Sequence, residues 1–286
     1  MGGVLGRFAA KKLRGKNDIK VIYTAHGFHF YKGAPLFNWL IYYPIEKYLA
    51  KMTDIIVTIN EEDYERAKGF NSKVFKIDGV GVNLEKFYPC LSVTDKEKLR
   101  CEYNFANDDF ILLYTAEFIP RKNHVVLFNI LPELKRLIPN LKVILCGKGV
   151  LLDYYKEYAE NKKMTEYVVF TGYTNNVADY CRLSDLLVMP SLQEGLPLAL
   201  IEAIATGLPV VASRIRGHTD VIENDVNGYL YTVDDEDQLK ELILKLKNNP
   251  NIMKRMSEEN VQKSKIYSIE NAISAMGEIY SLMLDI

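Results

Sequence analysis

Short apolar runs alternate with helical segments along most of this chain of 286 residues. Runs such as Phe110–Thr115 and Leu141–Cys146 have the length and aliphatic content of buried strands, and segments with helical apolar spacing lie between them. One series of such runs precedes a polar stretch at residues 91–107, and a longer series follows it. Strands that alternate with helices form parallel sheets with helices on both faces. The sequence therefore predicts an α/β fold with parallel sheets.

The expected elements can be given by residue range. Strands are expected at Lys20–Ala25, Asp54–Ile59, Val74–Ile77, Phe110–Thr115, Leu141–Cys146, Val168–Thr171, Asp185–Met189, Pro209–Ser213 and Gly228–Tyr231. Helices are expected at residues 3–15, Phe37–Lys51, Glu61–Lys68, His124–Ile138, Leu151–Asn161, Val177–Ser184, Pro197–Thr206, Gln238–Lys247, Asn251–Lys263 and Ile269–Leu284. Ligands of such sheets bind where loops leave the carboxyl ends of strands, so we expect the functional residues in those loops.

Charge and cysteine content exclude several classes of protein. The formal net charge is −1 from 36 basic and 37 acidic residues, so a nucleic-acid partner is not expected. The four cysteines form no CxxC pair, which excludes a zinc ribbon and indicates reduced thiols. Basic residues are concentrated in the first twenty positions. A solvated helix face explains that cluster as well as contact with anionic lipid headgroups or with a phosphorylated acceptor does.

Two glutamates flank the start of one expected helix. Glu194 stands directly ahead of it, and Glu202 follows within it. The backbone between them and the helix dipole are expected to form an anion site. That segment consists of Gly195, Leu196, Pro197 and Leu198. Taken singly, Glu194 is explained by helix capping and Glu202 by an exposed helix position. Together, the two carboxylates can hold both ends of one extended polar ligand with its phosphates between them.

The spacing of Glu194 and Glu202 after a strand that ends in Pro-Ser resembles the signature of retaining glycosyltransferases of family 4. Further segments match that family in the same order: Gly147–Gly149, Phe170–Tyr173, Ser184–Ser191, Leu208–Ser213 and Asn227–Leu230. The similarity is greatest to enzymes that build bacterial capsule, exopolysaccharide or lipid-linked glycans. It implies the GT-B fold, which has two Rossmann-like domains with parallel sheets.

The resemblance also implies a division of the chain. Residues 1–106 correspond to a partial N-terminal, acceptor-side Rossmann-like domain and linker, and residues 107–266 to the C-terminal donor-binding domain. Residues 267–286 correspond to a helix that packs back on the N-terminal domain. Because the Met1-Gly-Gly start resembles an internal stretch of longer family members, we expect the N-terminal domain to be truncated.

The family's donor-binding roles transfer onto matching positions. The resemblance implies that Glu194 contacts the donor sugar and steadies positive charge at its anomeric carbon, and that Glu202 accepts hydrogen bonds from the ribose. Amides at Gly195 to Leu198 would hold the distal phosphate and sugar. Gly147 and Gly217 match glycines in donor loops of the family. Gly172 and Tyr173 match the loop that touches the base of the donor.

Cations are expected where negative charge grows on the leaving diphosphate. Lys122 matches the family's phosphate lysine. The family's usual Gly-Arg is replaced here by Ala116-Glu117, so Arg121 is our candidate for the second cation. His26 matches the N-domain histidine and is expected to donate to the donor's sugar or phosphate. A solvated turn is the alternative for the cation pair, and a structural histidine is the alternative for His26.

The expected function is transfer of a hexosyl or N-acetylhexosaminyl group from a nucleotide-diphosphate donor, with a UDP-sugar favoured. The acceptor would be lipid-linked or a saccharide in cell-surface polysaccharide synthesis, and the family usually needs no metal or other cofactor. The alternative is a truncated, non-catalytic nucleotide-sugar-binding fragment or subunit that needs another chain. A cytoplasmic location is expected. The aromatic stretch at residues 28–43 indicates a buried core helix or, alternatively, peripheral contact with an anionic plasma membrane.

Overall fold

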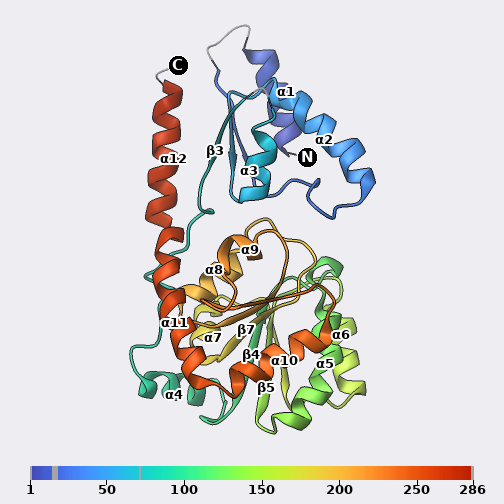
Figure 1. The fold of residues 1–286 in the computed structure, drawn as a ribbon, viewed down its shortest axis with the longest axis vertical. Helices are drawn as coiled ribbons and strands as arrows, with labels where there is room; N and C mark the ends of the chain where they lie inside the picture. Colours follow the sequence, from blue (N-terminus) through green and yellow to red (C-terminus); the bar gives the residue numbers. More distant parts are fainter. Residues whose placement is uncertain (1, 15–18, 71, 285–286) are drawn as a thin grey trace. The chain divides into compact units, whose positions relative to one another are not determined.

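A computed structural model describes residues 2–14, 19–70 and 72–284. The chain divides into two compact units, one formed by Met1–Gly81 with Ile269–Ile286 and the other by Val82–Ser268. Each unit contains one sheet whose strands are all parallel (Figure 1). The predicted α/β class with two parallel sheets is therefore confirmed.

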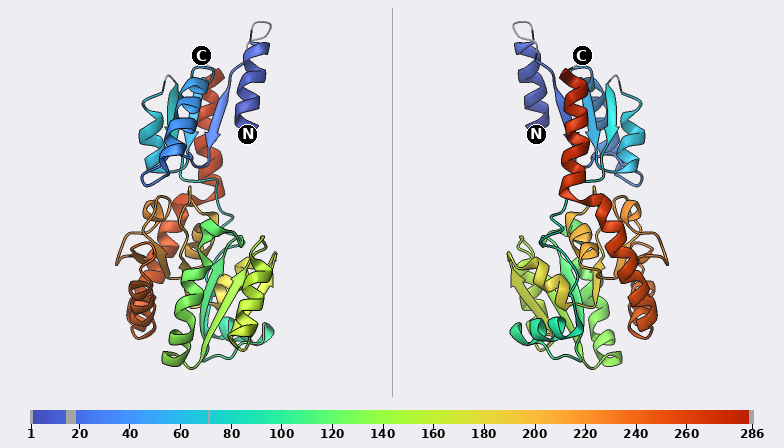
Figure 2. Two further views of the ribbon diagram at one scale, coloured as in Figure 1. Left: turned by 90° about the vertical axis from the view of Figure 1, so that its right-hand side faces the viewer. Right: turned by 90° about the vertical axis from the view of Figure 1, so that its left-hand side faces the viewer.

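The first unit contains a three-stranded sheet in the order β1-β2-β3. Its strands are β1 (Ile22–Ala25), β2 (Ile55–Thr58) and β3 (Lys73–Lys76). Its helices are α1 (Gly2–Leu13), α2 (Leu36–Ala50), α3 (Glu61–Ala67) and α12 (Ile269–Leu284). Figures 1 and 2 show α2 and α3 on one side of this sheet and α12 on the other. Asn60 caps α3, because its side chain accepts a hydrogen bond of 2.9 Å from the amide of Asp63.

The second unit contains a six-stranded sheet in the order β6-β5-β4-β7-β8-β9. Its strands are β4 (Phe110–Thr115), β5 (Leu141–Cys146), β6 (Val168–Gly172), β7 (Leu186–Met189), β8 (Val210–Ser213) and β9 (Tyr229–Tyr231). The strand order runs outward in one direction from β4 to β6 and in the other from β7 to β9. The junction of β4 and β7 is therefore a topological switch point, where ligands of such sheets bind.

Helices cover both faces of the six-stranded sheet, as expected for right-handed crossovers. The helices of this unit are α4 (Val93–Glu102), α5 (His124–Leu137), α6 (Leu152–Asn161), α7 (Val177–Leu183), α8 (Leu198–Ala205), α9 (His218–Val221), α10 (Glu236–Lys247) and α11 (Pro250–Ser264). Two short 3-10 turns, η1 (Pro120–Lys122) and η2 (Lys265–Tyr267), complete it.

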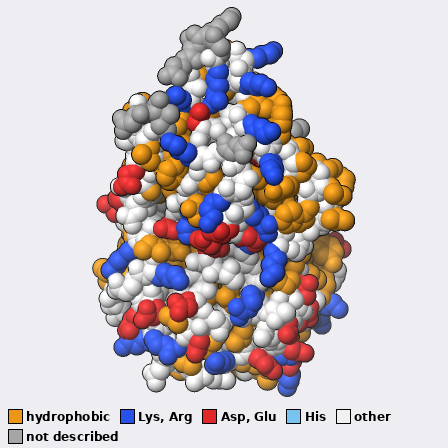
Figure 3. Space-filling model, turned by 45° about the horizontal axis from the view of Figure 1, so that its top comes forward, with side chains coloured by type: hydrophobic (Ala, Val, Ile, Leu, Met, Phe, Trp, Pro, Cys, Tyr) orange, Lys and Arg blue, Asp and Glu red, His pale blue; other side chains and the backbone are white. Residues whose placement is uncertain are grey.

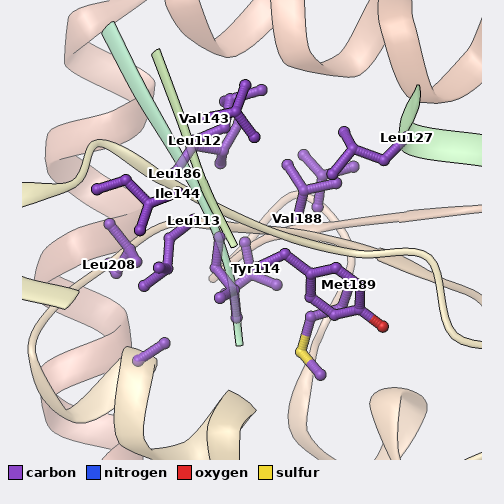
Figure 4. Packing of buried hydrophobic residues seen from close by; sticks show 14 of the residues in the cluster. Leu112, Leu113, Tyr114, Leu127, Val143, Ile144, Leu186, Val188, Met189 and Leu208 are labelled. Atoms are coloured by element: carbon purple, nitrogen blue, oxygen red, sulfur yellow. The ribbon is translucent and has the colours of Figure 1, made fainter. Parts of the chain in front are cut away.

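The central residues of this sheet are apolar and fully buried from solvent. Every residue from Ile111 to Leu113 in β4 and from Leu186 to Val188 in β7 is 0% exposed. Figure 4 shows four of them, packed with side chains of β5 and with Leu127 of α5: Leu112, Leu113, Leu186 and Val188. Burial of this kind stabilises the unit by roughly 1.5–3 kcal/mol for each large aliphatic side chain. The rigid strands therefore fix where the loops at their carboxyl ends begin.

Three local features differ from the sequence expectation or refine it. The polar stretch at 91–107 contains α4, and its Arg100 is 4% exposed and donates to Asp185 at 2.7 Å, so α4 belongs to the second unit. The helix expected to start at Pro197 starts one residue later, and Pro197 is its N-cap. The aromatic helix α2 is only partly a core helix, because Phe37 and Leu40 on one of its faces are exposed.

Candidate active site

The loops that follow β4 and β7 meet at the switch point of the second unit. The first loop carries Arg121 and Lys122 in the turn η1, and the second carries Glu194. The amide of Leu192 donates to the carbonyl of Arg121 at 2.8 Å, which joins the two loops. Residues separated by 72 positions in sequence are thus brought together by the pairing of β4 with β7.

Lys122 and Glu194 form a shielded ion pair. The ammonium Nζ of Lys122 lies 2.5 Å from Oε1 of Glu194, and their side chains are 12% and 6% exposed. Arg121 is 45% exposed, and its guanidinium lies 3.6 Å from the other carboxylate oxygen of Glu194. Two cations therefore converge on one buried carboxylate. Arginine and lysine side chains bind phosphate groups as well as carboxylates.

The loop after β8 fixes the backbone of Glu194 by a hydrogen bond. The buried Arg216 donates from Nε to the carbonyl of Glu194 at 3.1 Å. Gly217 has a φ of +82°, and a side-chain carbon there would overlap the carbonyl oxygen of Gly195. Only glycine fits at position 217 without moving the Glu194 loop.

The segment after Glu194 leads into helix α8. Gly195 and Leu196 are half-buried, Pro197 is buried, and Leu198 begins the helix. Because proline has no amide hydrogen, the amides that this segment can offer to an anion are those of Gly195, Leu196 and Leu198. The prediction that amides of this segment bind an anion therefore applies to these three residues.

Glu202 lies in α8 and is half-buried. Burial raises the pKa of Glu202 from its ordinary value of 4.5 to about 7, and the nearby Lys86 opposes that rise. A carboxyl group in this environment gains from hydroxyl donors, because they stabilise its ionised form. An exposed helix position, the simple interpretation of Glu202 from sequence, does not describe it.

A pocket of about 550 Å³ opens at the carboxyl ends of β4, β5 and β6. Gly147 and Gly149 form part of its wall, and a side-chain carbon at Gly147 would overlap the carbonyl oxygen of Ala116. Tyr173 is 70% exposed at its rim, and the ammonium of Lys148 lies 5.6 Å from the centre of its ring. An aromatic rim next to exposed backbone suits a flat heterocyclic ring.

Two further predicted residues lie by these elements. Gly172 ends β6 with a φ of +66°, which favours glycine, and space around it is open. Glu117, which stands where the family's arginine was expected, also lines the pocket. Pocket and ion pair thus lie along one edge of the same sheet.

His26 belongs to the first unit. It directly follows β1, as expected, and it is exposed. The chain continues from it through Gly27 into the buried Phe28, which stacks on Phe30 at 4.7 Å between ring centres. The position of His26 at the carboxyl end of a strand is compatible with a ligand-binding role, which remains a prediction.

Several residues that support the site carry little signal in the sequence. Tyr114, Ser191, Ser213 and His218 are all buried beneath the Lys122–Glu194 pair. Burial lowers the pKa of His218, which favours its neutral form. The signal that could have found three of them is a hydroxyl residue at or near the end of an apolar strand: Tyr114 in β4, Ser191 after β7 and Ser213 in β8.

The residues that the structure describes lack the features of a metal site and of a membrane span. They contain no cluster of three or more His, Cys, Asp or Glu side chains that could hold a metal ion. Asp235 and Asp237 have an Asp-x-Asp spacing, but Asp235 caps α10 and Asp237 pairs with Lys240 at 2.9 Å. No helix in the described part of the chain combines the length and apolar content of a membrane span.

Comparison with solved structures defines the class of fold. Sucrose-phosphate synthase from Thermosynechococcus elongatus matches with a TM-score of 0.82 at 21% identity, over 99% of this chain and 72% of that one. HepE of Anabaena, in complex with UDP and glucose, matches with a TM-score of 0.82 at 19% identity, over 98% and 75%. The fold is that of the GT-B glycosyltransferases, as the sequence predicted.

Comparison of sequences defines the family. The model of the glycosyl transferases group 1 matches residues 95–263, and this chain belongs to that family. EpsD of Bacillus subtilis, which is named as a glycosyltransferase, is 38% identical over 288 residues, covering 100% of this chain and 75% of EpsD. The UDP-Gal:alpha-D-GlcNAc-diphosphoundecaprenol alpha-1,3-galactosyltransferase of Escherichia coli is 29% identical over 292 residues, covering 99% and 73%.

Proposed function

We propose that this chain transfers a hexosyl or N-acetylhexosaminyl group from a UDP-sugar to a lipid-linked or saccharide acceptor in cell-surface polysaccharide synthesis. The observation that carries the proposal is the convergence of Arg121 and Lys122 on Glu194 at the switch point. Cations there can neutralise a departing diphosphate, and a carboxylate beside them can face the sugar that loses it. The membership of the chain in the group 1 glycosyl transferases supports the same reaction class.

The donor is assigned along the edge of the six-stranded sheet. Its base occupies the pocket beside Gly147, Gly172 and Tyr173, and Glu202 accepts hydrogen bonds from its ribose. Lys122 and Arg121 take the diphosphate when it displaces them from Glu194. The amides of Gly195, Leu196 and Leu198 bind the distal phosphate and the sugar. UDP is favoured because the structures of the similar HepE hold UDP and UDP-glucose.

The transfer is proposed to retain the anomeric configuration, as in family 4. The diphosphate leaves on the same face from which the acceptor hydroxyl attacks, and its oxygen takes the hydroxyl proton. Glu194 steadies the positive charge that develops at the anomeric carbon, and no side chain forms a covalent bond to the sugar. His26 donates to the sugar or a phosphate. No metal ion or additional cofactor is assigned to the reaction.

The lipid-linked acceptor is supported by the name of the similar Escherichia coli enzyme, whose acceptor contains diphosphoundecaprenol. A transfer assay tests the proposal. Purified chain is incubated with radiolabelled UDP-glucose, UDP-galactose or UDP-N-acetylglucosamine and a short-chain GlcNAc-diphosphoprenol, and the anomeric proton coupling of the product is measured by NMR. An α-linked product supports the proposal, and a β-linked product contradicts retention. Binding of UDP without transfer favours the alternative of a non-catalytic binding subunit.

Peripheral contact with an anionic membrane on the cytoplasmic side is proposed for α1 and α2. Exposed apolar side chains on these helices include Leu5, Phe8, Phe37 and Leu40. Exposed lysines stand among them at Lys11, Lys12, Lys47 and Lys51. The buried Arg7 of α1 pairs with Glu46 of α2 at 2.8 Å, which holds the two helices together. Figure 3 shows hydrophobic side chains beside Lys and Arg side chains in its upper part.

Such a surface combines apolar insertion with attraction to anionic headgroups. Flotation with phosphatidylglycerol vesicles at low and high salt tests it. Binding should weaken with salt and with the double variant Phe37→Ser/Leu40→Ser, and it should persist in Leu137→Ser, which alters an exposed leucine of the second unit. Equal flotation of all variants would remove the membrane from the proposal.

A further inference from the structure

A chain of hydrogen bonds runs beneath the Lys122–Glu194 pair, across three neighbouring strands. His218 donates from Nδ1 to the carbonyl of Ser213 at 2.8 Å. Ser213 donates from its hydroxyl to the carbonyl of Ser191 at 2.5 Å. Tyr114 donates from its hydroxyl to the carbonyl of Lys122 at 2.7 Å. The hydroxyl oxygens of Ser191 and Tyr114 lie 3.1 Å apart.

The direction of this chain is fixed by its acceptors. The carbonyl groups of Ser213, Ser191 and Lys122 can only accept, so each hydrogen bond to them has a defined donor. Because the hydrogen of Tyr114 is used on Lys122, the hydroxyl of Ser191 must donate to Tyr114. The bonds therefore all point one way, from His218 toward Lys122. The last two bonds form a continuous series, because the Tyr114 hydroxyl accepts from Ser191 and donates to Lys122, and the bonds of such a series polarise and strengthen one another.

The chain lies in the least exposed part of the second unit. Tyr114 is 1% exposed, and Ser191, Ser213 and His218 are 0% exposed. These residues come from β4, the loop after β7, the end of β8 and the start of α9. Since β4, β7 and β8 are neighbours in the sheet, the chain crosses the switch point from one side to the other. Figure 4 shows Tyr114 among the aliphatic side chains of this core.

The end point of the chain is the turn that carries both cations. The Tyr114 hydroxyl donates a hydrogen bond to the carbonyl of Lys122, and the amide of Leu192 donates one to the carbonyl of Arg121. Removal of the Tyr114 hydroxyl would leave two buried groups, the Lys122 carbonyl and the Ser191 hydroxyl, without this bond. The turn would then lose one of the contacts that fix it relative to Glu194, whose backbone accepts a separate hydrogen bond from Arg216.

Tyr231 provides a natural comparison. It is also 0% exposed, and it ends β9 in the same sheet. Its hydroxyl is buried without a hydrogen-bond partner in the described structure. A buried tyrosine hydroxyl is thus tolerated in this core without a network. Burial of a tyrosine does not by itself explain the hydrogen bonds of Tyr114, which end at the turn that carries Arg121 and Lys122.

We propose that Tyr114, Ser191, Ser213 and His218 are positioning residues that set the Arg121–Lys122 turn at the distance from Glu194 which the donor's diphosphate requires. The inference rests on the proposed use of a UDP-sugar. It adds to that function a group of residues that never touch the donor and that act through the backbone of Lys122.

Binding of two probes separates positioning from general stability. UDP contains the diphosphate, whereas uridine contains only the base and ribose. Affinities of the wild type, Tyr114→Phe, Ser213→Ala and Tyr231→Phe for both probes are measured by calorimetry and ligand-observed NMR. We expect Tyr114→Phe to weaken UDP binding about fivefold to tenfold, as loss of one net hydrogen bond would, and to leave uridine binding unchanged. Ser213→Ala should weaken UDP binding relative to uridine binding by a smaller factor, and Tyr231→Phe should change neither affinity.

The outcomes distinguish the two proposals. Failure of the wild type to bind UDP contradicts the proposed function itself. If the wild type binds UDP and Tyr114→Phe loses affinity for UDP and uridine to the same extent, the hydrogen bonds of Tyr114 affect only the stability of the fold. The positioning role is then wrong. Should Tyr114→Phe prove too unstable to measure, the Ser213→Ala ratio decides in the same way.

Discussion

Substitution of Glu194 by glutamine should have opposite effects on nucleotide binding and on turnover. The Glu194 carboxylate lies 2.5 Å from the ammonium of Lys122 and 3.6 Å from the guanidinium of Arg121. A diphosphate that enters must compete with it for those cations. Glutamine keeps the shape of the side chain and removes the competing charge. Glu194→Gln should therefore bind UDP more tightly than the wild type.

The size of the effect follows from the geometry of the pair. Two unit charges about 4 Å apart attract by about 4 kcal/mol at an effective dielectric constant near 20. Both side chains are shielded, at 12% and 6% exposed, so solvent screens the pair only in part. Desolvation offsets much of the attraction. Recovery of about one third of it by the diphosphate corresponds to about 1.4 kcal/mol, or about tenfold tighter binding.

Turnover should move the other way. The glutamine cannot stabilise positive charge at the anomeric carbon, and the loss of one preorganised electrostatic group costs about 100-fold to 1,000-fold in kcat. The variant should also melt at a lower temperature without ligand, because Lys122 loses its charged partner, and UDP should restore more stability to it than to the wild type. Calorimetric titration with UDP and a transfer assay measure both effects. Glu259→Gln, an exposed acid on α11, controls for net charge.

UDP affinity in Glu194→Gln equal to or below that of the wild type would refute the competition between the carboxylate and the diphosphate. Loss of turnover alone would not support it, since many changes at a reaction centre lower the rate.

Three further predictions follow from buried groups of the second unit. Burial lowers the pKa of His124 to about 3, so the stability that its neutral form contributes is complete above about pH 6.5 and is lost as pH falls toward 3. The variant His124→Phe should therefore lose less stability than the wild type between pH 7 and pH 4, as measured by urea melts. Burial raises the pKa of Glu202 to about 7, so ionisation costs up to about 3 kcal/mol as pH rises from 4.5 through 7, and Glu202→Gln should gain stability relative to the wild type at pH 8 but not at pH 4. Gly217→Ala should lower kcat about tenfold or more and reduce the melting temperature, because its side chain would displace the Gly195 carbonyl at a φ of +82°; unchanged values would show that the loop adapts.

Much of the fold could be predicted because strand and helix signals are local. The strands at Phe110–Thr115 and Leu141–Cys146 match their predicted bounds, since runs of aliphatic residues between polar turns have few other structures open to them. The position of Lys122 and Glu194 in loops after strands was predictable for the same reason. The glycine at 217 could be recognised as special, but its contact with Gly195 could not.

What could not be predicted depends on the pairing of distant strands. The contact of Lys122 with Glu194 requires β4 to lie beside β7, which no local pattern determines. The hydrogen-bond chain through Tyr114 and Ser213 has the same origin. The half-buried state of Glu202 arises from packing around α8, and the exposed face of α2 arises because only Trp39 and Tyr43 of its aromatic residues pack toward the core.

In the proposed function, the second unit binds a nucleotide diphosphate along the carboxyl ends of its sheet, with Glu202 on the ribose. Calorimetric titration of UDP, GDP and ADP into the wild type, Glu202→Ala and the exposed control Glu259→Ala tests it most directly. We expect UDP to bind the wild type and the control equally and to bind Glu202→Ala at least about tenfold more weakly, since a ribose held by a carboxylate loses about 1.5–3 kcal/mol with it. Equal binding of UDP to all three proteins, or binding to none, would show that Glu202 does not hold the ribose of a nucleotide at this sheet.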